Sequence, residues 1–220
     1  MKTILWEVDV QADFMLPGGK LYVPGAEKII PNVNRLIEAA RQGRTLLISS
    51  ADAHQPDDAE FREWPPHCVK GTAGAELIPE ARAESQLVIP NHKDFVLPRD
   101  LSSYQQILLE KNTLDVFDNP NTVALLARRN ASRKTATGSS PEFLVFGVVT
   151  EYCVLRAAEG LLRRGYRVSL IEDAIQSLDE KKGREILADL ESRGARLITT
   201  EQALGLIRGE SRSAAAAFKT

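Results

Sequence analysis

Short runs of apolar residues alternate along this chain with stretches in which apolar and polar residues recur at a helical period. The runs are rich in Val, Ile and Leu, which is typical of strands buried on both faces. Apolar residues spaced three and four apart predict amphipathic helices between them. The predicted strands cover residues 4–10, 45–50, 86–89, 107–109, 143–149, 166–171 and 196–198, and the predicted helices residues 25–43, 123–129, 154–162, 182–192 and 201–208.

This alternation predicts a parallel sheet with helices on both faces. We therefore expect an α/β fold with three layers, α/β/α, around a mostly parallel sheet of about six strands. Residues 1–208 are expected to form one domain, and residues 209–220, with four consecutive alanines, a frayed tail. The polar, proline-containing segment 53–79 is expected to be a functional or disordered loop, and residues 130–140 an exposed loop.

The strand predicted at 143–149 is followed directly by a helical pattern that contains a cysteine. Thr150 or Glu151 can begin this helix and Gly165 can end it, which places Cys153 in the first turn. Free N–H groups and the positive end of the helix dipole in that turn would lower the pKa of a cysteine. They could also stabilise an oxyanion. The alternative is that Cys153 is a small buried apolar residue.

Five polar residues lie at or just beyond the ends of predicted strands: Asp9, Asp52, His54, Lys111 and Cys153. In parallel α/β sheets, ligands bind beyond the carboxyl ends of the strands. Core or surface residues without a shared role would scatter over both ends of the sheet. The clustering therefore indicates a functional site at this edge.

A metal site is indicated by Asp52 and His54, two residues apart after a strand, and by His67 in the following loop. This mixture of oxygen and nitrogen ligands suits a divalent zinc, manganese or iron ion. Glu60 is a candidate fourth ligand, whereas His92 has no partner at a suitable spacing and is expected at the surface. The alternative for each loop residue is solvated surface, although the prolines before His67 rigidify its segment.

An acid–base pair is also available for the thiol. Asp9 could take the proton of Cys153 if partial burial raises the pKa of the carboxyl group. Lys111 could hold that carboxylate in place. The alternatives are a turn cap for Asp9 and a solvated strand end for Lys111.

Composition excludes several other classes of function. The chain has 220 residues, 43% of them hydrophobic, a net charge of −2 and a pI near 6.0, with no basic run for nucleic acid or an anionic membrane. No stretch of 18 apolar residues and no leader pattern is found, so we expect a cytoplasmic protein. As a separate expectation, the protein is a homo-oligomer. Cys68 and Cys153 make no disulfide framework, although a bridge between them stays open. Cys68 is either a buried small residue, a metal ligand or a second thiol.

Five segments together resemble the nicotinamidase branch of the isochorismatase-like cysteine hydrolases. The most specific of them is the run WPPHCVKGT, which points to nicotinamidases within the superfamily. Isochorismatases themselves lack the nucleophilic cysteine, so we do not expect that activity. The five segments are residues 8–14 (VDVQADF), 52–54 (DAH), 64–72 (WPPHCVKGT), 110–111 (EK) and 147–154 (GVVTEYCV).

The resemblance implies a role for each residue of the expected site. The catalytic lysine is assigned to Lys111 from its strand context and its distance to the cysteine, although Lys93 better matches the distance from the metal histidine in many relatives. A cis peptide bond is implied between Val149 and Thr150. The implied roles are catalysis by Asp9, Lys111 and Cys153, an oxyanion hole at Val149, Thr150 and Cys153, substrate contacts from Phe14, Trp64 and Tyr152, and metal ligation by Asp52, His54, His67 and Glu60.

The resemblance implies hydrolysis of nicotinamide to nicotinate and ammonia through a thioester, with a small-molecule amide as the substrate and no nucleic acid or membrane as a partner. Two alternatives remain open. The first is a related cysteine hydrolase of another small amide, of the carbamoyl, ureido or maleamate type. The second is a ligand-binding protein of this fold without catalysis.

Overall fold

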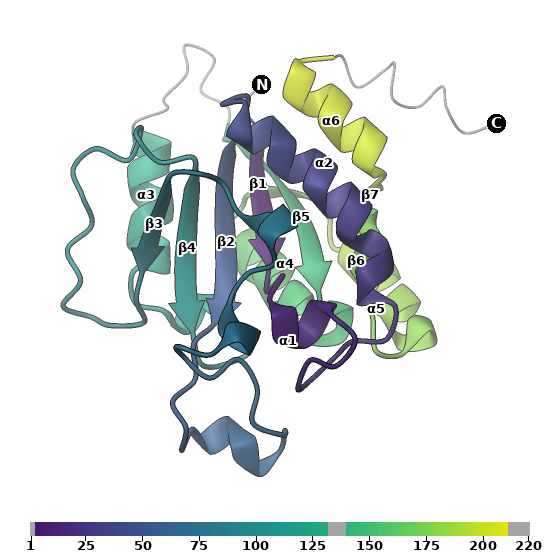
Figure 1. The fold of residues 1–220 in the computed structure, drawn as a ribbon. Helices are drawn as coiled ribbons and strands as arrows, with labels where there is room; N and C mark the ends of the chain where they lie inside the picture. The colour runs from purple at the N-terminus through teal and green to yellow at the C-terminus, as the bar shows by residue number, and fades with distance from the viewer. Residues whose placement is uncertain (1–2, 132–139, 211–220) are drawn as a thin grey trace.

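The computed structural model describes residues 3–131 and 140–210, which form a parallel sheet between two layers of helices (Figure 1). The strand order within these residues is β3-β4-β2-β1-β5-β6-β7, and every neighbouring pair is parallel. The strands are β1 (Thr3–Val8), β2 (Leu46–Asp52), β3 (Gln86–Ile89), β4 (Gln106–Lys111), β5 (Glu142–Val148), β6 (Arg167–Gln176) and β7 (Arg196–Ile198).

Helices cover both faces of this sheet. In Figure 1, α2 and α6 lie in front of the strands, and α3, α4 and α5 lie behind them. The short α1 follows β1 at the carboxyl end of the sheet. The α-helices are α1 (Ala12–Met15), α2 (Ile30–Arg41), α3 (Thr122–Ala131), α4 (Leu155–Arg163), α5 (Glu180–Ser192) and α6 (Thr200–Arg208). Shorter helical turns occur at Ala26–Ile29, Ala59–Arg62, Ala73–Ala75, Pro79–Ala81, Val116–Asp118 and Thr150–Val154.

The three central strands are buried along their whole length, which explains their continuous apolar runs. β1 lies between β2 and β5, in register from Ile4 to Val8 on one side and from Thr3 to Val8 on the other. Gly147 has φ +119°, and a Cβ atom there would lie 2.1 Å from the carbonyl oxygen of Val8. Only glycine therefore allows β5 to approach β1 so closely beside the end of the strand.

The three-layer α/β/α fold predicted from the sequence is confirmed, with seven strands in the described residues rather than about six. β6 continues to Gln176, beyond the predicted end at residue 171, because it bulges and resumes pairing with β5. The segment after β1, expected as a turn, contains α1. The segment 53–79 is held by isolated bridges at Gln11–Leu77 and His54–Val69.

Part of the predicted loop at 130–140 is helical, since α3 runs to Ala131, and residues 132–139 lie outside the described residues. Residues 211–220 of the predicted tail also lie outside the described residues. Among the helices of the described ranges, none is both long and apolar enough to cross a membrane.

A carboxyl group lies buried inside the sheet and forms no ion pair with any of the described residues. Glu7 of β1 is fully buried and accepts hydrogen bonds from the hydroxyl of Ser49 and from Gln106 Nε2, the latter at 3.1 Å. Its other oxygen has no hydrogen-bond partner within the described residues. Burial raises the pKa of Glu7 to about 8, although these two hydrogen bonds act to lower it.

We predict that Glu7→Gln stabilises the protein in a pH-dependent way. The raised pKa means that the folded protein keeps Glu7 protonated where the unfolded chain ionises it, so this part of the stability is complete below the usual glutamate pKa and is lost as the pH rises towards 8. Glutamine mimics the protonated acid and removes that loss. The Tm of Glu7→Gln should match that of the wild type near pH 4.5 and exceed it progressively up to pH 8. A constant difference in Tm over this range would contradict the assignment.

Candidate active site

The carboxyl edge of the sheet brings three charged residues from different strands into one cluster. Asp52 and Lys111 are directly paired in the register of β2 with β4. Asp9 follows β1 with φ +53°, and its N–H donates to the carbonyl of Ser50 at 3.1 Å. This left-handed conformation is one that aspartate tolerates better than most residues. The left-handed conformation of Asp9 turns the chain directly after the end of β1.

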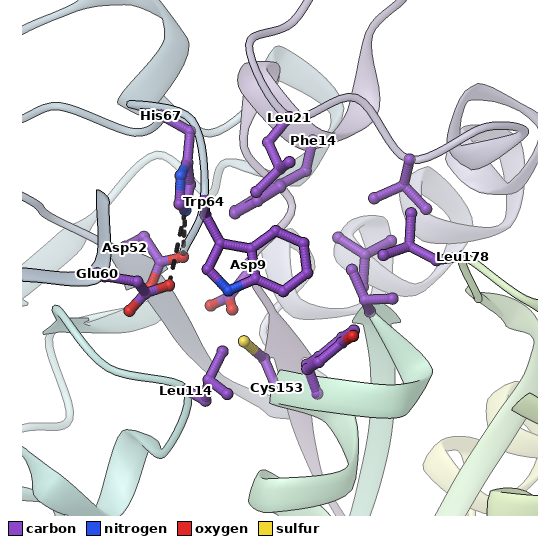
Figure 2. Close-up of a pocket in the computed structure, with 14 residues that line it drawn as sticks. Asp9, Phe14, Leu21, Asp52, Glu60, Trp64, His67, Leu114, Cys153 and Leu178 are labelled. Atoms are coloured by element: carbon purple, nitrogen blue, oxygen red, sulfur yellow. Dashed lines mark ion pairs between the residues drawn. The ribbon is translucent and has the colours of Figure 1, made fainter. Parts of the chain in front are cut away.

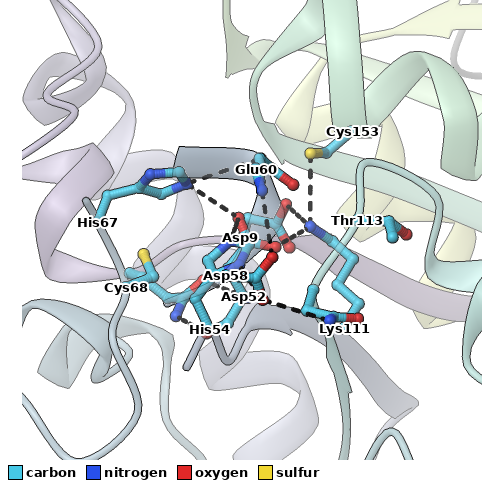
Figure 3. A network of polar contacts seen from close by, with 12 residues as sticks. Asp9, Asp52, His54, Asp58, Glu60, His67, Cys68, Lys111, Thr113 and Cys153 are labelled. Atoms are coloured by element: carbon cyan, nitrogen blue, oxygen red, sulfur yellow. Dashed lines mark hydrogen bonds and ion pairs between the residues drawn. The ribbon is translucent and has the colours of Figure 1, made fainter. Parts of the chain in front are cut away.

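The ammonium group of Lys111 joins the cluster (Figure 3). Its Nζ atom lies 2.9 Å from Asp9 Oδ2, donates a short hydrogen bond to Asp52 Oδ1 and lies 3.5 Å from Cys153 Sγ. All three charged side chains are less than 5% exposed. Ser50 Oγ donates to the second oxygen of Asp9 at 2.7 Å. The lysine therefore bridges both carboxylates and the thiol.

The two carboxyl groups respond differently to burial. Burial acts to raise the pKa of Asp52, but Lys111 and the nearby histidines together lower it below its usual range. For Asp9, burial prevails over the attraction of Lys111 and raises the pKa. The pKa of Lys111 is well above its usual value, because Asp52 and Asp9 overcome the effect of burial. Asp52 is thus the ionised partner of Lys111, and Asp9 has the higher affinity for a proton.

Cys153 lies in the first helical turn after β5, as the sequence predicted. This turn, Thr150–Val154, is π-helical and leads into α4. The expectation of a lowered thiol pKa is wrong for this structure. Cys153 is only 8% exposed, and burial raises its pKa well above the usual value, against the opposing effect of Lys111. The thiol therefore needs a base, and Asp9 is a carboxyl group with raised proton affinity beside it.

The backbone before Cys153 differs by one residue from the expectation. The cis peptide bond joins Val148 to Val149, not Val149 to Thr150. The N–H groups of Tyr152 and Val154 both donate to the carbonyl of Val149 at 3.1 Å, so these two donors are occupied. Of the three residues expected to form the oxyanion hole, Thr150 and Cys153 lie within this turn, and Val149 directly precedes it.

Three predicted metal ligands lie together on the other side of Asp52. Asp52 Oδ2 lies 3.8 Å from Nε2 of His54 and 3.8 Å from Nε2 of His67, and the three ligand atoms lie within 4.8 Å of one another. Tetrahedral zinc with bonds near 2.0–2.1 Å separates its ligand atoms by about 3.3 Å, so the observed spacing is close to what a metal needs. The three side chains are buried.

The histidines present the nitrogen atoms that a metal requires. His67 Nδ1 lies 2.8 Å from the carbonyl oxygen of Pro65, to which it donates, so the ring is held with Nε2 facing Asp52. His54 Nδ1 lies 3.2 Å from Asp58, and its buried Nε2 makes no hydrogen bond to any described residue. An orphaned nitrogen beside a carboxylate and a second imidazole fits a divalent metal.

Glu60, the candidate fourth ligand, is more distant. Its Oε1 lies 4.0 Å from His67 Nε2, and the side chain is 16% exposed. Partial burial and the nearby Asp52 raise its pKa. Glu60 therefore faces the cluster of Asp52, His54 and His67 but lies farther from it than these three residues lie from one another.

A cavity joins the thiol to the metal-ligand cluster (Figure 2). Its empty space, including the part open to solvent, is about 430 Å³. Asp9, Asp52, Glu60, His67 and Cys153 supply its polar lining. The remaining walls are apolar or aromatic and come from Phe14, Leu21, Val23, Trp64, Leu114, Val148, Val149, Tyr152 and Leu178.

The three residues expected to contact substrate all line this cavity. Trp64 and Tyr152 meet edge to face with ring centroids 5.3 Å apart, and Phe14 packs against the His67 ring at 5.3 Å. Leu114 and Leu178 also line it, and nothing in their sequence context indicated this, because each stands in a loop whose path depends on the whole fold.

Other candidates from the sequence lie elsewhere. Lys93 and His92 are exposed. Cys68 is fully buried, with φ +44°, and burial raises its pKa far above the usual range. Both cysteines are free thiols, so the open possibility of a bridge between them is not realised.

Comparison with known proteins gives one family match and three informative individual relatives. The family model described as the isochorismatase domain matches residues 3–97 and 87–202. The nicotinamidase of Escherichia coli (strain K12) is 23% identical over 214 residues, covering 87% of this chain and 92% of that protein.

Two solved structures share the fold at higher identity. The pyrazinamidase of Pyrococcus horikoshii in complex with zinc is 28% identical with a TM-score of 0.69, covering 90% of this chain and 99% of that one. The N-carbamoylsarcosine amidase from Thermoplasma acidophilum is 26% identical with a TM-score of 0.68, covering 91% and 97%. The chain is thus similar to proteins named for more than one small amide.

We predict that iodoacetamide modifies Cys153 and spares Cys68 in the native protein. Cys153 lines the cavity beside a carboxyl base, whereas Cys68 is fully buried. Peptide mass spectrometry after brief labelling should find the adduct on Cys153, and Cys153→Ala should abolish labelling. Modification of Cys68 before Cys153 would contradict the assignment of the reactive thiol.

Replacing the two candidate lysines should have very different effects. Lys111→Ala leaves Asp9 and Asp52 buried without their cation, which typically costs about 3–5 kcal/mol of stability, and should lower kcat for amide hydrolysis by several orders of magnitude. Lys93→Ala changes an exposed residue and should leave both the Tm and kcat near those of the wild type. Thermal melts and ammonia release from folded protein measure the two effects, and the reverse ranking would move the role to Lys93.

Proposed function

This chain is a hydrolase of the isochorismatase family and resembles its nicotinamidase branch, and on that premise we propose that it hydrolyses nicotinamide to nicotinate and ammonia. The observation that carries the proposal is a cavity that has a thiol with its base at one end, Asp52 and His67 of the buried ligand cluster at the other, and aromatic and apolar walls between them. A flat pyridine ring with a carboxamide group matches each of these parts.

The chemistry begins at the thiol. Asp9, whose burial gives it a raised proton affinity, accepts the proton of Cys153 as Sγ attacks the carboxamide carbon. The N–H groups of Thr150 and Cys153 donate to the oxyanion of the tetrahedral intermediate. When that intermediate collapses, the C–N bond breaks, and Asp9 delivers its proton to the departing ammonia. This leaves a thioester on Cys153.

Water completes the cycle. Asp9 takes a proton from the water molecule that attacks the thioester carbonyl, and the same N–H groups hold the second oxyanion. Collapse breaks the C–S bond and releases the product as its carboxylic acid, which loses its proton to solvent, while Asp9 returns the first proton to the thiolate. Lys111, 3.5 Å from Sγ and 2.9 Å from Asp9, stabilises the thiolate and keeps the base in place.

Asp52, His54 and His67 are the residues that would hold a divalent metal, with Glu60 in reach of the same ion. When bound, the metal would act as a Lewis acid towards the lone pair of a pyridine nitrogen and so fix the ring. Phe14 and Trp64 would flank that ring.

The cavity also bears on the choice among amides. Its described lining includes three carboxyl groups, of Asp9, Asp52 and Glu60, and no arginine or lysine. A substrate that carries its own carboxylate, as maleamate or N-carbamoylsarcosine does, would have no protein cation at this wall to pair with. A neutral heteroaromatic amide avoids this cost, which favours nicotinamide over the alternatives.

A panel of amides tests the substrate. On the zinc-loaded protein we expect kcat/KM to be high for nicotinamide and pyrazinamide, and lower by orders of magnitude for benzamide, which has the ring and the amide but no ring nitrogen. Maleamate and N-carbamoylsarcosine should also be poor substrates. Ammonia release measured by a coupled assay gives the rates, with Cys153→Ala as the blank.

Two results would contradict the proposal. Equal rates for nicotinamide and benzamide would remove the role of the metal-ligand end in binding the ring. Rapid turnover of a carbamoyl compound without turnover of nicotinamide would place the chain with the other small-amide hydrolases.

A further inference from the structure

Two buried polar side chains next to α1 belong neither to the thiol group nor to the metal-ligand group. Gln11, the residue before α1, is fully buried, and Asp13, within it, is 6% exposed. Neither is within the three-residue ligand cluster. Each is instead hydrogen-bonded to the backbone of a segment that carries a metal ligand.

Gln11 holds the backbone of Asp52. Its Oε1 accepts from the N–H of Asp52 at 2.7 Å, and its Nε2 donates to the carbonyl of Asp52 at 2.8 Å. The same Nε2 donates to the carbonyl of Ala75 at 2.7 Å, which ties the end of the long loop to the end of β2. All three bonds need the amide in one orientation, because a flip would set donor against donor and acceptor against acceptor.

Asp13 holds the segment that follows His67. Its Oδ2 accepts from the N–H of Cys68 at 2.7 Å, and its Oδ1 accepts from the N–H of Lys20 at 2.9 Å. Cys68 has φ +44°, a conformation that a non-glycine residue adopts only when its surroundings impose it. The hydrogen bond that the N–H of Cys68 donates to Asp13 fixes this residue, directly after the histidine whose Nε2 faces Asp52.

The packing around Asp13 leaves no freedom for another arrangement. A Cβ atom at Gly74 would lie 2.2 Å from Asp13 Oδ2, so the loop can press onto the carboxylate only with glycine at this position. Thus residues from one short element fix both ends of the ligand cluster: Asp52 at the end of β2 and the His67 segment in the loop.

We propose that Gln11 and Asp13 are positioning residues that set the spacing of Asp52 and His67 and thereby the affinity of this site for a divalent metal. The inference rests on the metal site of the proposed function and goes beyond it, because it concerns residues that touch no metal. Partners of this kind typically contribute 10- to 100-fold to metal affinity.

The substitutions that test this change a hydrogen-bonding atom with little change in size. Gln11→Glu places an oxygen opposite the carbonyls of Asp52 and Ala75, and Asp13→Asn places an amide group between two N–H donors. The chain offers a matched control for each. Gln105 also bridges backbone groups of separate segments, at Arg41, Glu84 and Ser85, and Asp179 also accepts from two backbone N–H groups, of Lys181 and Lys182.

Cobalt(II) alone is titrated into chelator-treated full-length protein and followed by its visible absorbance, which reports the geometry of the ligands independently of activity. We expect Gln11→Glu and Asp13→Asn to raise the cobalt Kd 10- to 100-fold and to change the absorbance spectrum. Gln105→Glu and Asp179→Asn should keep the wild-type Kd and spectrum, even where they lower the Tm. A test variant that does not fold, as judged by circular dichroism, is replaced by Gln11→Ala or Asp13→Ala.

Three other outcomes of the cobalt titration would contradict the positioning role. Test variants with the wild-type Kd and spectrum would overturn the positioning role and leave the metal site of the proposed function intact. An equal loss of affinity in the control variants would overturn it too, because the effect would then follow general destabilisation. Failure of the wild type to bind cobalt would overturn both the positioning role and the metal part of the proposed function.

Discussion

The buried ammonium group of Lys111 is the interaction on which the carboxyl edge of the sheet depends. A cation in the protein interior is tolerated only when it is paired and hydrogen-bonded. Here Asp9 and Asp52, from β1 and β2, meet that need within hydrogen-bonding distance. Their meeting follows from strand order, since β2 lies between β1 and β4 and all three strands end at the same edge. The strand order therefore brings the three charged residues together, and their pairing in turn makes the buried lysine tolerable at this edge of the sheet.

Asp52 gives this cluster two chemically distinct sides. One of its oxygens bonds to Lys111, and the other faces the imidazole nitrogens of His54 and His67 at 3.8 Å. A single carboxylate thus connects the thiol and its base to the candidate metal ligands. Because Asp52 serves both groups, its backbone must be held in place, and Gln11 does this with two hydrogen bonds to the N–H and carbonyl of Asp52.

The segment between β2 and β3 remains ordered beside the site with little regular structure of its own. Buried backbone groups need partners, and side chains near α1 supply several of them, to Asp52, Cys68 and Ala75. The buried Glu7 at the interior of the same sheet makes the contrast clear. It has hydrogen bonds but no cation, and its pKa is raised to about 8. Pairing with Lys111 is what keeps Asp52 ionised at comparable burial.

The sequence by itself determined the fold class, the polar edge and the membership of most of the site. Apolar runs and helical periods report burial directly, and parallel strands bring their carboxyl ends together whatever their spacing in the chain. That is why the sequence pattern predicts that Asp9, Asp52, His54 and Cys153 lie at one edge of the sheet. Tertiary structure alone decided what depends on distance and dielectric environment. It confirmed the position of Lys111, which strand context favours over Lys93, between the carboxylates, because the β2–β4 register pairs Lys111 with Asp52.

The same reason accounts for the remaining differences. The helix start predicted a lowered pKa for Cys153, but burial, which no local pattern reports, raises it. The resemblance placed the cis peptide bond between Val149 and Thr150, whereas the structure has it one residue earlier, between Val148 and Val149. Leu114 and Leu178 entered the cavity through loop paths that no periodicity encodes. Residue types and their periods fix which groups are available, whereas only packing fixes how far apart they lie and how much water remains between them.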